Sequence, residues 1–181
     1  MPKIDLHTES LIQTIKSEGV VVLKYFVKDV EPIKSKATSL FNQIKDGEQA
    51  ELRKNLKAVG PYEAGKLCRM YPDAYSKHPE IYSVFDTQWH HDVVKGYLGP
   101  HHEFCKQIFI SHEYKVETSD IVRNAYLHFD PFHALKFILY LTDTTKENGA
   151  FRYIPKSRET GEKLRREFCQ TEDAWEFINY S

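Results

Sequence analysis

Apolar side chains recur at helical spacing in several parts of the chain. Within Thr8–Glu18, Leu11, Ile12 and Ile15 fall on one face of a helix, and Gly19 supplies an end signal. The same reasoning predicts further helices that begin at Asp29 to Pro32 and end at Asp46, and that span Gln49–Ala58 and Asp86–Leu98, with a last amphipathic stretch at Asp173–Ile178. Ser157–Phe168 is expected to be helical as a charged segment.

Other stretches have the length and composition of strands. Leu135–Leu141 is a nearly unbroken apolar run, interrupted only by Lys136, and it is typical of a buried strand. Asn148-Gly149 follows as a strong turn signal. Strands are also predicted over Val20–Phe26, Lys106–Val116, Ile121–His128 and Phe151–Pro155.

The candidate chemistry lies at the end of one predicted strand. Side chains alternate along a strand, so His128 and Asp130 project to the same side while Phe129 points away. One imidazole and one carboxylate are two members of the 2-His-1-carboxylate triad that holds Fe(II) on one face. The pair alone is weak evidence. The order of a strand, the pair, a buried strand, an Asn-Gly turn and a further strand strengthens it, because this is the core of a double-stranded β-helix.

The run LHFDPFHALKFILYLTDTTKENGAFRYIPKS resembles the core of the phytanoyl-CoA dioxygenase-like branch of the Fe(II)/2-oxoglutarate oxygenases. Members show an H-x-D pair, an "LK-F-YLTD" type strand, an "ENG" turn and an "IPGSH" ending. His128 and Asp130 match the metal pair and Glu147-Asn148-Gly149 matches the turn. Lys156 stands where Gly is usual, and Arg158 stands where His is usual.

The resemblance implies a third ligand that this sequence does not provide. In the family, a downstream His completes the triad and a following Arg grips the far carboxylate of 2-oxoglutarate. No His follows His133, and the sequence stops at Ser181. The chain is then a fragment, a natural truncation, or a protein with a different metal site, and the sequence does not decide between these.

The expected fold follows from the same resemblance. It is mainly β with flanking helices, a double-stranded β-helix of the jelly-roll, cupin-like type that lacks its last strands. We expect a single oxygenase-like domain over residues 1–181, incomplete at its C-terminal end. Gly60–Ser83 shows no sustained period and is expected to be irregular, either as an ordinary surface connection or as a lid over the mouth of the barrel.

Two residues are candidates for binding the co-substrate. Lys136 shares one face of its predicted strand with Ile138 and Tyr140. If that face lines the barrel, the buried ammonium needs an anion, and the C5 carboxylate of 2-oxoglutarate would supply it. Alternatively, Lys136 reaches outward or pairs with a protein carboxylate. Ser111 on the neighbouring strand is a weaker candidate for a hydrogen bond to the same co-substrate.

Other histidines are less informative. His90-His91 and His101-His102 suggest zinc, but adjacent helical residues point about 100° apart, so neither pair chelates one ion easily. His133 follows Asp130 by three positions. It could complete the metal site, but the family pattern does not use this position, and we expect a loop residue near the site.

Composition narrows the remaining choices. With 181 residues, 41% hydrophobic and 13% aromatic, the chain is expected to fold as a globular protein. The formal net charge of −1 gives no reason to expect nucleic acid or a membrane as partner, and no apolar run is long enough to cross a bilayer. Three widely spaced cysteines and an N-terminus without a secretory signal favour the cytoplasm.

These observations predict a dioxygenase that uses Fe(II), 2-oxoglutarate and O2 to hydroxylate a small organic substrate. The family's substrates range from lipids to amino acids and natural products, so neither the substrate nor the oligomeric state follows. The alternative is a catalytically inactive, truncated relative that keeps the scaffold and binds a small molecule or a partner.

Overall fold

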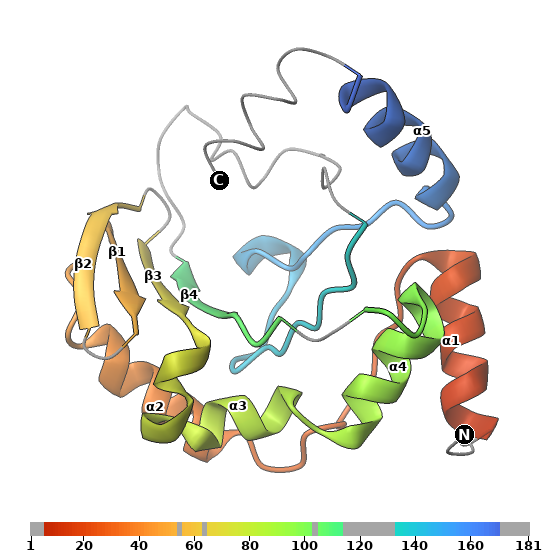
Figure 1. Cartoon of the computed structure of the whole chain (residues 1–181). Helices are drawn as coiled ribbons and strands as arrows, with labels where there is room; N and C mark the ends of the chain where they lie inside the picture. The colour runs from red at the N-terminus through yellow and green to blue at the C-terminus, as the bar shows by residue number, and fades with distance from the viewer. Residues whose placement is uncertain (1–5, 54–55, 63–64, 103–104, 114–132, 171–181) are drawn as a thin grey trace.

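The computed structural model describes residues 6–53, 56–62, 65–102, 105–113 and 133–170 (Figure 1). In chain order its elements are α1 (Leu6–Glu18), α2 (Glu31–Phe41), β1 (Glu48–Leu52), β2 (Leu56–Pro61), β3 (Gly65–Met70), the 3₁₀-helix η1 (Pro72–Lys77), α3 (Pro79–Phe85), α4 (Gln88–Leu98), β4 (Ile108–Glu113), the 3₁₀-helix η3 (Lys146–Asn148) and α5 (Arg158–Phe168). The strands lie at one end of the molecule, and α1, α4 and α5 lie at the other (Figure 1).

The four strands form one mixed sheet with the order β2-β1-β3-β4. β1 is antiparallel to β2 and parallel to β3, and β3 is antiparallel to β4. Alternation along the strands divides the sheet into two faces. We call them the core face, with Ala50, Leu52, Cys68, Met70, Ile108 and Ile110, and the far face, with Gln49, Glu51, Leu67, Arg69, Phe109 and Ser111.

The core face is covered by helices. The amphipathic helix α2 buries Ile33, Ala37, Leu40 and Phe41, and α3 buries Ile81 and Tyr82. These side chains form one apolar cluster with the core face of the sheet. The Tyr82 hydroxyl donates a hydrogen bond to the carbonyl of Tyr71, so its one polar group is satisfied inside the core.

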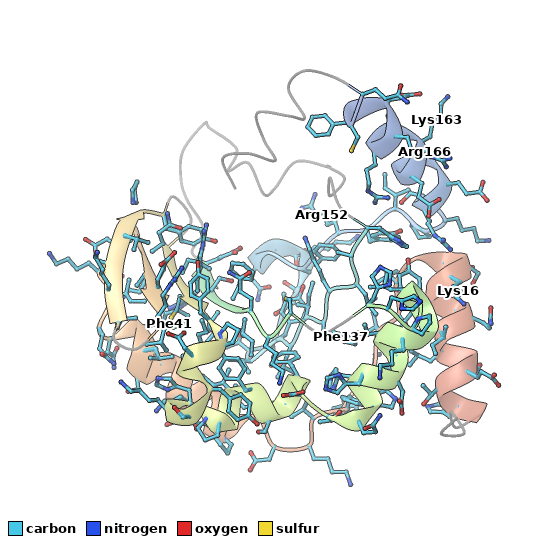
Figure 2. The ribbon with its side chains drawn as sticks, viewed as in Figure 1. Lys16, Phe41, Phe137, Arg152, Lys163 and Arg166 are labelled. Atoms are coloured by element: carbon cyan, nitrogen blue, oxygen red, sulfur yellow. The ribbon has the colours of Figure 1, made fainter. Side chains whose placement is uncertain are left out.

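A second apolar cluster joins α1 to α4. It contains Leu11, Ile12 and Ile15 from α1 and Val93 from α4. Gly96 lets the two helices approach closely, because a Cβ at this position would overlap the side chain of Ile12. Figure 2 marks the two clusters by Phe41, which belongs to the sheet cluster, and by Phe137, which packs against the second one.

The segment from Leu135 to Leu141 connects the two clusters. Leu135 and Phe137 pack against the α1–α4 cluster, and Leu139 and Leu141 pack against the sheet cluster. The intervening residues, Lys136, Ile138 and Tyr140, are exposed. The burial therefore alternates as in a strand, but the segment forms no β-ladder within the described residues, so the strand predicted over Leu135–Leu141 is wrong as a hydrogen-bonded element.

Helix predictions from a buried stripe are confirmed for α1, α2 and α4. The charged helical segment is confirmed as α5, and β4 confirms the strand prediction for its described part. Gly19 ends α1 with φ +83°, and a Cβ there would collide with the hydroxyl of Tyr153. The predicted turn is confirmed as well. In it, Asn148 accepts a hydrogen bond from the backbone N–H of Thr145, and Gly149 takes a left-handed φ of 96°.

The strand predicted over Phe151–Pro155 forms no β-ladder within the described residues and is wrong as well. Three further predictions are wrong. The apolar run Val20–Phe26 is not a strand; Tyr25, 92% exposed, adopts a φ of 59°, which interrupts an extended path. Gln49–Ala58 is not a helix. Leu52 and Leu56 are cross-strand partners of the β1–β2 pair, and their four-residue spacing imitates a helical period.

The third wrong prediction concerns Gly60–Ser83, which is not irregular. It contains β3, η1 and most of α3, and it contributes Met70, Ala74 and Tyr82 to the core. Its apolar positions serve three short elements in succession, so no single period extends far enough to be recognised. The segment is thus part of the sheet and of its cover, rather than a lid.

The fold class follows from these elements as a mixed four-stranded sheet with flanking helices, which is compatible with a mainly β fold. The strands that would close a double-stranded β-helix, including the predicted Ile121–His128, lie outside the described residues, as does Asp173–Ile178. Within the described ranges, no helix has the length and apolarity needed to cross a membrane.

Candidate functional site

The predicted metal ligands His128 and Asp130 lie outside the described residues. The described chain ends at Glu113 on one side of them and resumes at His133 on the other. Elsewhere in the described ranges, no three His, Cys, Asp or Glu side chains are grouped so that they could hold a metal ion. The pair in the H-x-D motif is therefore the metal-ligand candidate that remains.

The histidines of α4 have separate protein partners. His90 Nδ1 lies 2.8 Å from Thr87 Oγ1, and His91 Nε2 lies 2.6 Å from Asp86 Oδ1. Asp86 also forms an ion pair with Lys106, whose Nζ lies 3.4 Å from Asp86 Oδ2. The hydrogen bond from His91, and then the one from Lys106, lowers the pKa of Asp86 despite its burial. Both histidines thus contribute to local structure.

Ser111, the predicted co-substrate residue of β4, lies exposed on the far face opposite Leu67. The end of β4 is held by a hydrogen bond, which the Tyr62 hydroxyl donates to Glu113 Oε1 at 3.2 Å. Burial first, and then the charge of Glu113, raises the pKa of Tyr62 to about 12. The phenol therefore stays protonated and remains a donor at neutral pH.

Arg69 on β3 shares the far face with Ser111, and sequence reasoning missed it. Its Nε is buried without a hydrogen-bond partner among the described residues, and its guanidinium carbon lies 5.8 Å from the ring centre of Phe109. The sequence signal that could have indicated Arg69 is an arginine between two apolar residues, Cys68 and Met70, as in a strand with one buried face. It was overlooked because the segment was expected to be irregular.

The acid beside Arg69 is engaged by other groups. Glu51 is the register neighbour of Arg69 across β1 and β3. Its carboxylate accepts a hydrogen bond from the Tyr71 hydroxyl at 2.8 Å and an ion pair from Arg53 at 3.4 Å. Arg53 also lies over the Tyr71 ring at 4.1 Å. This network holds Glu51 at the edge of the far face, and the described residues include no hydrogen-bond partner for Arg69 Nε.

Lys136 lies on the exposed side of its segment. Its neighbours Leu135 and Phe137 face the second cluster, so the Lys136 side chain is turned away from the apolar core. Lys136 was predicted either to be buried in the barrel beside an anion or to reach outward, and in the described structure it is exposed. Its role in binding a co-substrate stays a prediction.

The motif after the turn is held by α1. Lys156, at the position where the family usually has Gly, adopts a left-handed φ of 61°. Its backbone N–H donates a hydrogen bond to the carbonyl of Glu18 at 3.1 Å, and its ammonium lies 3.9 Å from the Glu18 carboxylate. The left-handed backbone accounts for the usual glycine, because a residue with a Cβ is strained in this conformation.

Arg158, at the position where the family usually has His, begins α5. It donates a hydrogen bond to Glu162 at 2.9 Å, and its guanidinium carbon lies 5.8 Å from the ring centre of Tyr97. The His133 ring lies 5.7 Å from the same tyrosine ring. Arg158 and His133, far apart in the sequence, therefore meet around Tyr97 of α4.

Comparison with known proteins agrees with the motif. The family model described as Phytanoyl-CoA dioxygenase (PhyH) matches residues 16–179. No curated protein and no solved structure matches the chain. The match covers most of the 181 residues, including both helices that flank the sheet and the H-x-D pair. The chain therefore belongs to the phytanoyl-CoA dioxygenase (PhyH) family.

Proposed function

We propose that this protein is an Fe(II)- and 2-oxoglutarate-dependent dioxygenase that hydroxylates a small organic substrate. Family membership already places the chain among dioxygenase-type enzymes in general. The observation that supports the more specific proposal is the pair of polar residues on the far face, Arg69 and Ser111, which lie on adjacent strands and are turned away from the helical core.

The far face suits a dicarboxylate. An arginine can hold a carboxylate through two parallel hydrogen bonds, and such charge-assisted bonds are among the stronger ones in proteins. The buried Nε of Arg69 needs an acceptor, because a buried donor without a partner costs about 1–3 kcal/mol. We assign the distal carboxylate of 2-oxoglutarate to Arg69, with Ser111 as a further donor. Lys136 is a second candidate cation on the side of its segment turned from the core.

The ligand chemistry fits iron in part. His128 would supply one imidazole nitrogen and Asp130 one carboxylate oxygen, which are the donor types of the 2-His-1-carboxylate sites. Bound there, Fe(II) would supply the oxygen chemistry that couples decarboxylation of 2-oxoglutarate to hydroxylation of the substrate. The protein's own residues would hold 2-oxoglutarate and the substrate in place and would limit access of water to them.

The fold proposed for this function is the double-stranded β-helix, with the described sheet as one of its walls. The helical cover on the core face and the polar residues on the far face are the division expected of a barrel wall, with the far face toward the interior. We propose a single domain.

The experiment is a steady-state assay of succinate formation from 2-oxoglutarate. Asp130→Ala is expected to abolish the Fe(II)-dependent reaction. Arg69→Gln is expected to raise the KM for 2-oxoglutarate by about tenfold or more, because it removes one charge-assisted contact. Lys34→Gln is the matched control, since Lys34 lies on α2, which covers the core face of the sheet, and should leave the KM unchanged.

Two results would overturn the assignment. Undiminished turnover in Asp130→Ala would exclude the H-x-D pair as the metal site. Equal KM values for Arg69→Gln and Lys34→Gln would exclude the far face as the co-substrate site. A folded protein without any turnover of 2-oxoglutarate would favour the alternative of an inactive relative that binds a small molecule or a partner.

A further inference from the structure

Two aromatic contacts join the 133–137 segment to α4. The His133 ring lies 5.7 Å from the Tyr97 ring in an edge-to-face arrangement, and the Phe137 ring lies 4.7 Å from the His90 ring. Tyr97 is near the C-terminal end of α4, and His90 is near its N-terminal end. The segment therefore runs along α4 in the direction opposite to the helix.

The spacing of the two elements suits a continuous contact. His90, Val93 and Tyr97 are separated by three and four positions, so they share one helix face. That face extends over about 10 Å of helix, and an extended chain covers about 13 Å over the 133–137 segment. Leu135, in the middle of the segment, packs against the apolar cluster that Val93 forms with α1. Three alternate side chains of the segment thus reach the same side of α4.

α4 is itself well fixed in the fold. Val93 is buried against α1, and Gly96 lets the two helices approach closely. His90 is also buried, and its Nδ1 lies 2.8 Å from Thr87 Oγ1 at the start of the helix. A side chain that contacts this helix is therefore held at a defined place relative to α1.

The Tyr97 contact lies close to the proposed metal site by covalent geometry alone. His133 is the first described residue after the H-x-D pair, and it follows Asp130 by three positions. Three peptide units span at most about 11 Å between the Cα atoms, whatever path the chain takes. Holding His133 on α4 therefore limits the positions that Asp130 can take.

We propose that Tyr97 is a positioning residue for the metal site. It holds the His133 ring against α4 and so restrains the chain next to the H-x-D pair before the metal arrives. Such pre-organisation raises affinity, because less conformational freedom is lost when the metal binds. This role rests on the proposed function, in which the H-x-D pair holds the iron. Here His133 acts through its ring contact and not as a ligand.

The test is the dissociation constant for Fe(II) in the presence of 2-oxoglutarate, measured anaerobically on the full chain from the visible charge-transfer band. Tyr97→Leu removes the ring but keeps an apolar side chain. We expect its dissociation constant to rise by about three- to tenfold, the ratio that corresponds to the usual strength of one aromatic contact. Tyr97→Phe keeps the ring and is expected to bind iron with unaltered affinity. Circular dichroism verifies that each variant is folded.

Tyr75→Leu is the matched control. Tyr75 also forms a ring contact, with Tyr82 at 5.1 Å, but it lies on η1 and its partner belongs to the sheet cluster. The same substitution there removes a similar contact at a distance from α4, and we expect the dissociation constant for iron to stay unchanged. An equal rise in Tyr75→Leu and Tyr97→Leu would reflect a general loss of stability and would overturn the proposal.

Variants of His133 test whether Tyr97 acts through this residue, since Arg158 also lies 5.8 Å from the Tyr97 ring. His133 is exposed, so its variants are expected to fold even if Tyr97→Leu does not. His133→Leu should raise the dissociation constant as much as Tyr97→Leu does, and the double variant should bind iron no more weakly than either single variant. His133→Phe retains a ring and should bind iron with unaltered affinity.

Three further results would overturn the positioning role while leaving the proposed function intact. The first is unaltered iron affinity in His133→Leu. The second is an additive loss in the double variant, since Tyr97 would then act by another route. The third is loss of the band in His133→Phe, since this would make His133 a metal ligand. A folded, unaltered protein without any band would instead contradict the proposed function, and the positioning role with it.

Discussion

The imidazole of His90 lies among aromatic rings, at 4% exposure. The rings of Trp89 and Phe137 are 4.9 and 4.7 Å from it, and Phe26 and Phe85 are each 6.1 Å away. Thr87 Oγ1 accepts the backbone N–H of His90, so its own proton can be donated to Nδ1. Burial first, with the charge of His91 second, lowers the His90 pKa to about 4, so the ring is neutral at neutral pH.

Acid is therefore expected to destabilise the fold through His90. The unfolded chain binds a proton near pH 6.5, whereas folded His90 binds one only near pH 4. Stability is full above pH 6.5 and falls as the pH decreases toward 4, by about 1–3 kcal/mol from this residue. His90→Phe should flatten the decline in the free energy of unfolding, measured with urea at several pH values.

The control for that series is His101→Gln, because His101 is exposed and should leave the pH dependence unchanged. Some decline is expected to remain in His90→Phe, since burial also lowers the pKa values of His78 and His133. If the free energy of unfolding declined identically in His90→Phe and in the unaltered protein, the pKa of His90 would not differ between the folded and the unfolded chain.

Lys156 has a left-handed backbone at a position where the family usually has Gly. Its left-handed φ of 61° costs about 1–2 kcal/mol for a residue with a Cβ. The ion pair with Glu18 is long, at 3.9 Å, and exposed, so it offsets little of this. We expect Lys156→Gly to be more stable than Lys156→Ala by about 0.5–1 kcal/mol, because both variants lack the ion pair and only alanine retains the strain.

Thermal and urea unfolding of the two variants measure this difference. A Lys156→Ala protein as stable as Lys156→Gly would mean that the residue is not held in the left-handed region. The same comparison bears on the family motif, since a glycine preference at this position is then explained by the backbone and not by contact with a ligand.

At the scale of elements, the contact between α1 and α4 depends on Gly96. A methyl group there would displace the Ile12 side chain, which is 3% exposed and has little room to move. Gly96→Ala is expected to destabilise the protein by about 1–3 kcal/mol through overpacking. Gly161→Ala in α5 meets no atom within 4 Å and should stabilise by about 0.5–1 kcal/mol through helix propensity.

Equilibrium unfolding of this pair separates packing from propensity, because the substitution is the same and only its surroundings differ. Stabilisation by both variants would contradict the close approach of α1 to α4. The measurement is independent of any assumption about the metal site.

The elements that could be predicted from the sequence are those with one sustained pattern. The apolar stripes of α1, α2 and α4 each face one cluster over several turns, so the helical period is visible. The β1–β2 pair was missed because Leu52 and Leu56 meet across a tight connection at a spacing that also fits a helix. Leu135–Leu141 alternates in burial because it spans two clusters, which local pattern cannot distinguish from a paired strand.

At the scale of the whole molecule, the candidate site is assembled from distant parts of the chain. The H-x-D pair was recognisable in the sequence because its two residues are near neighbours, and the family match over residues 16–179 supports the same assignment of family. Arg69 was not recognisable, because its neighbours come together with it only through the sheet register. A local sequence pattern does not show contacts between residues that are far apart in the chain.

His128 and Asp130 are proposed to hold iron together with 2-oxoglutarate, and an anaerobic Fe(II) titration tests this assignment. With 2-oxoglutarate present, we expect a visible charge-transfer band that saturates near one iron per chain, disappears in His128→Ala, and persists at higher 2-oxoglutarate concentration in Arg69→Gln. A folded protein that gives no band, or a band that His128→Ala leaves intact, would contradict the assignment.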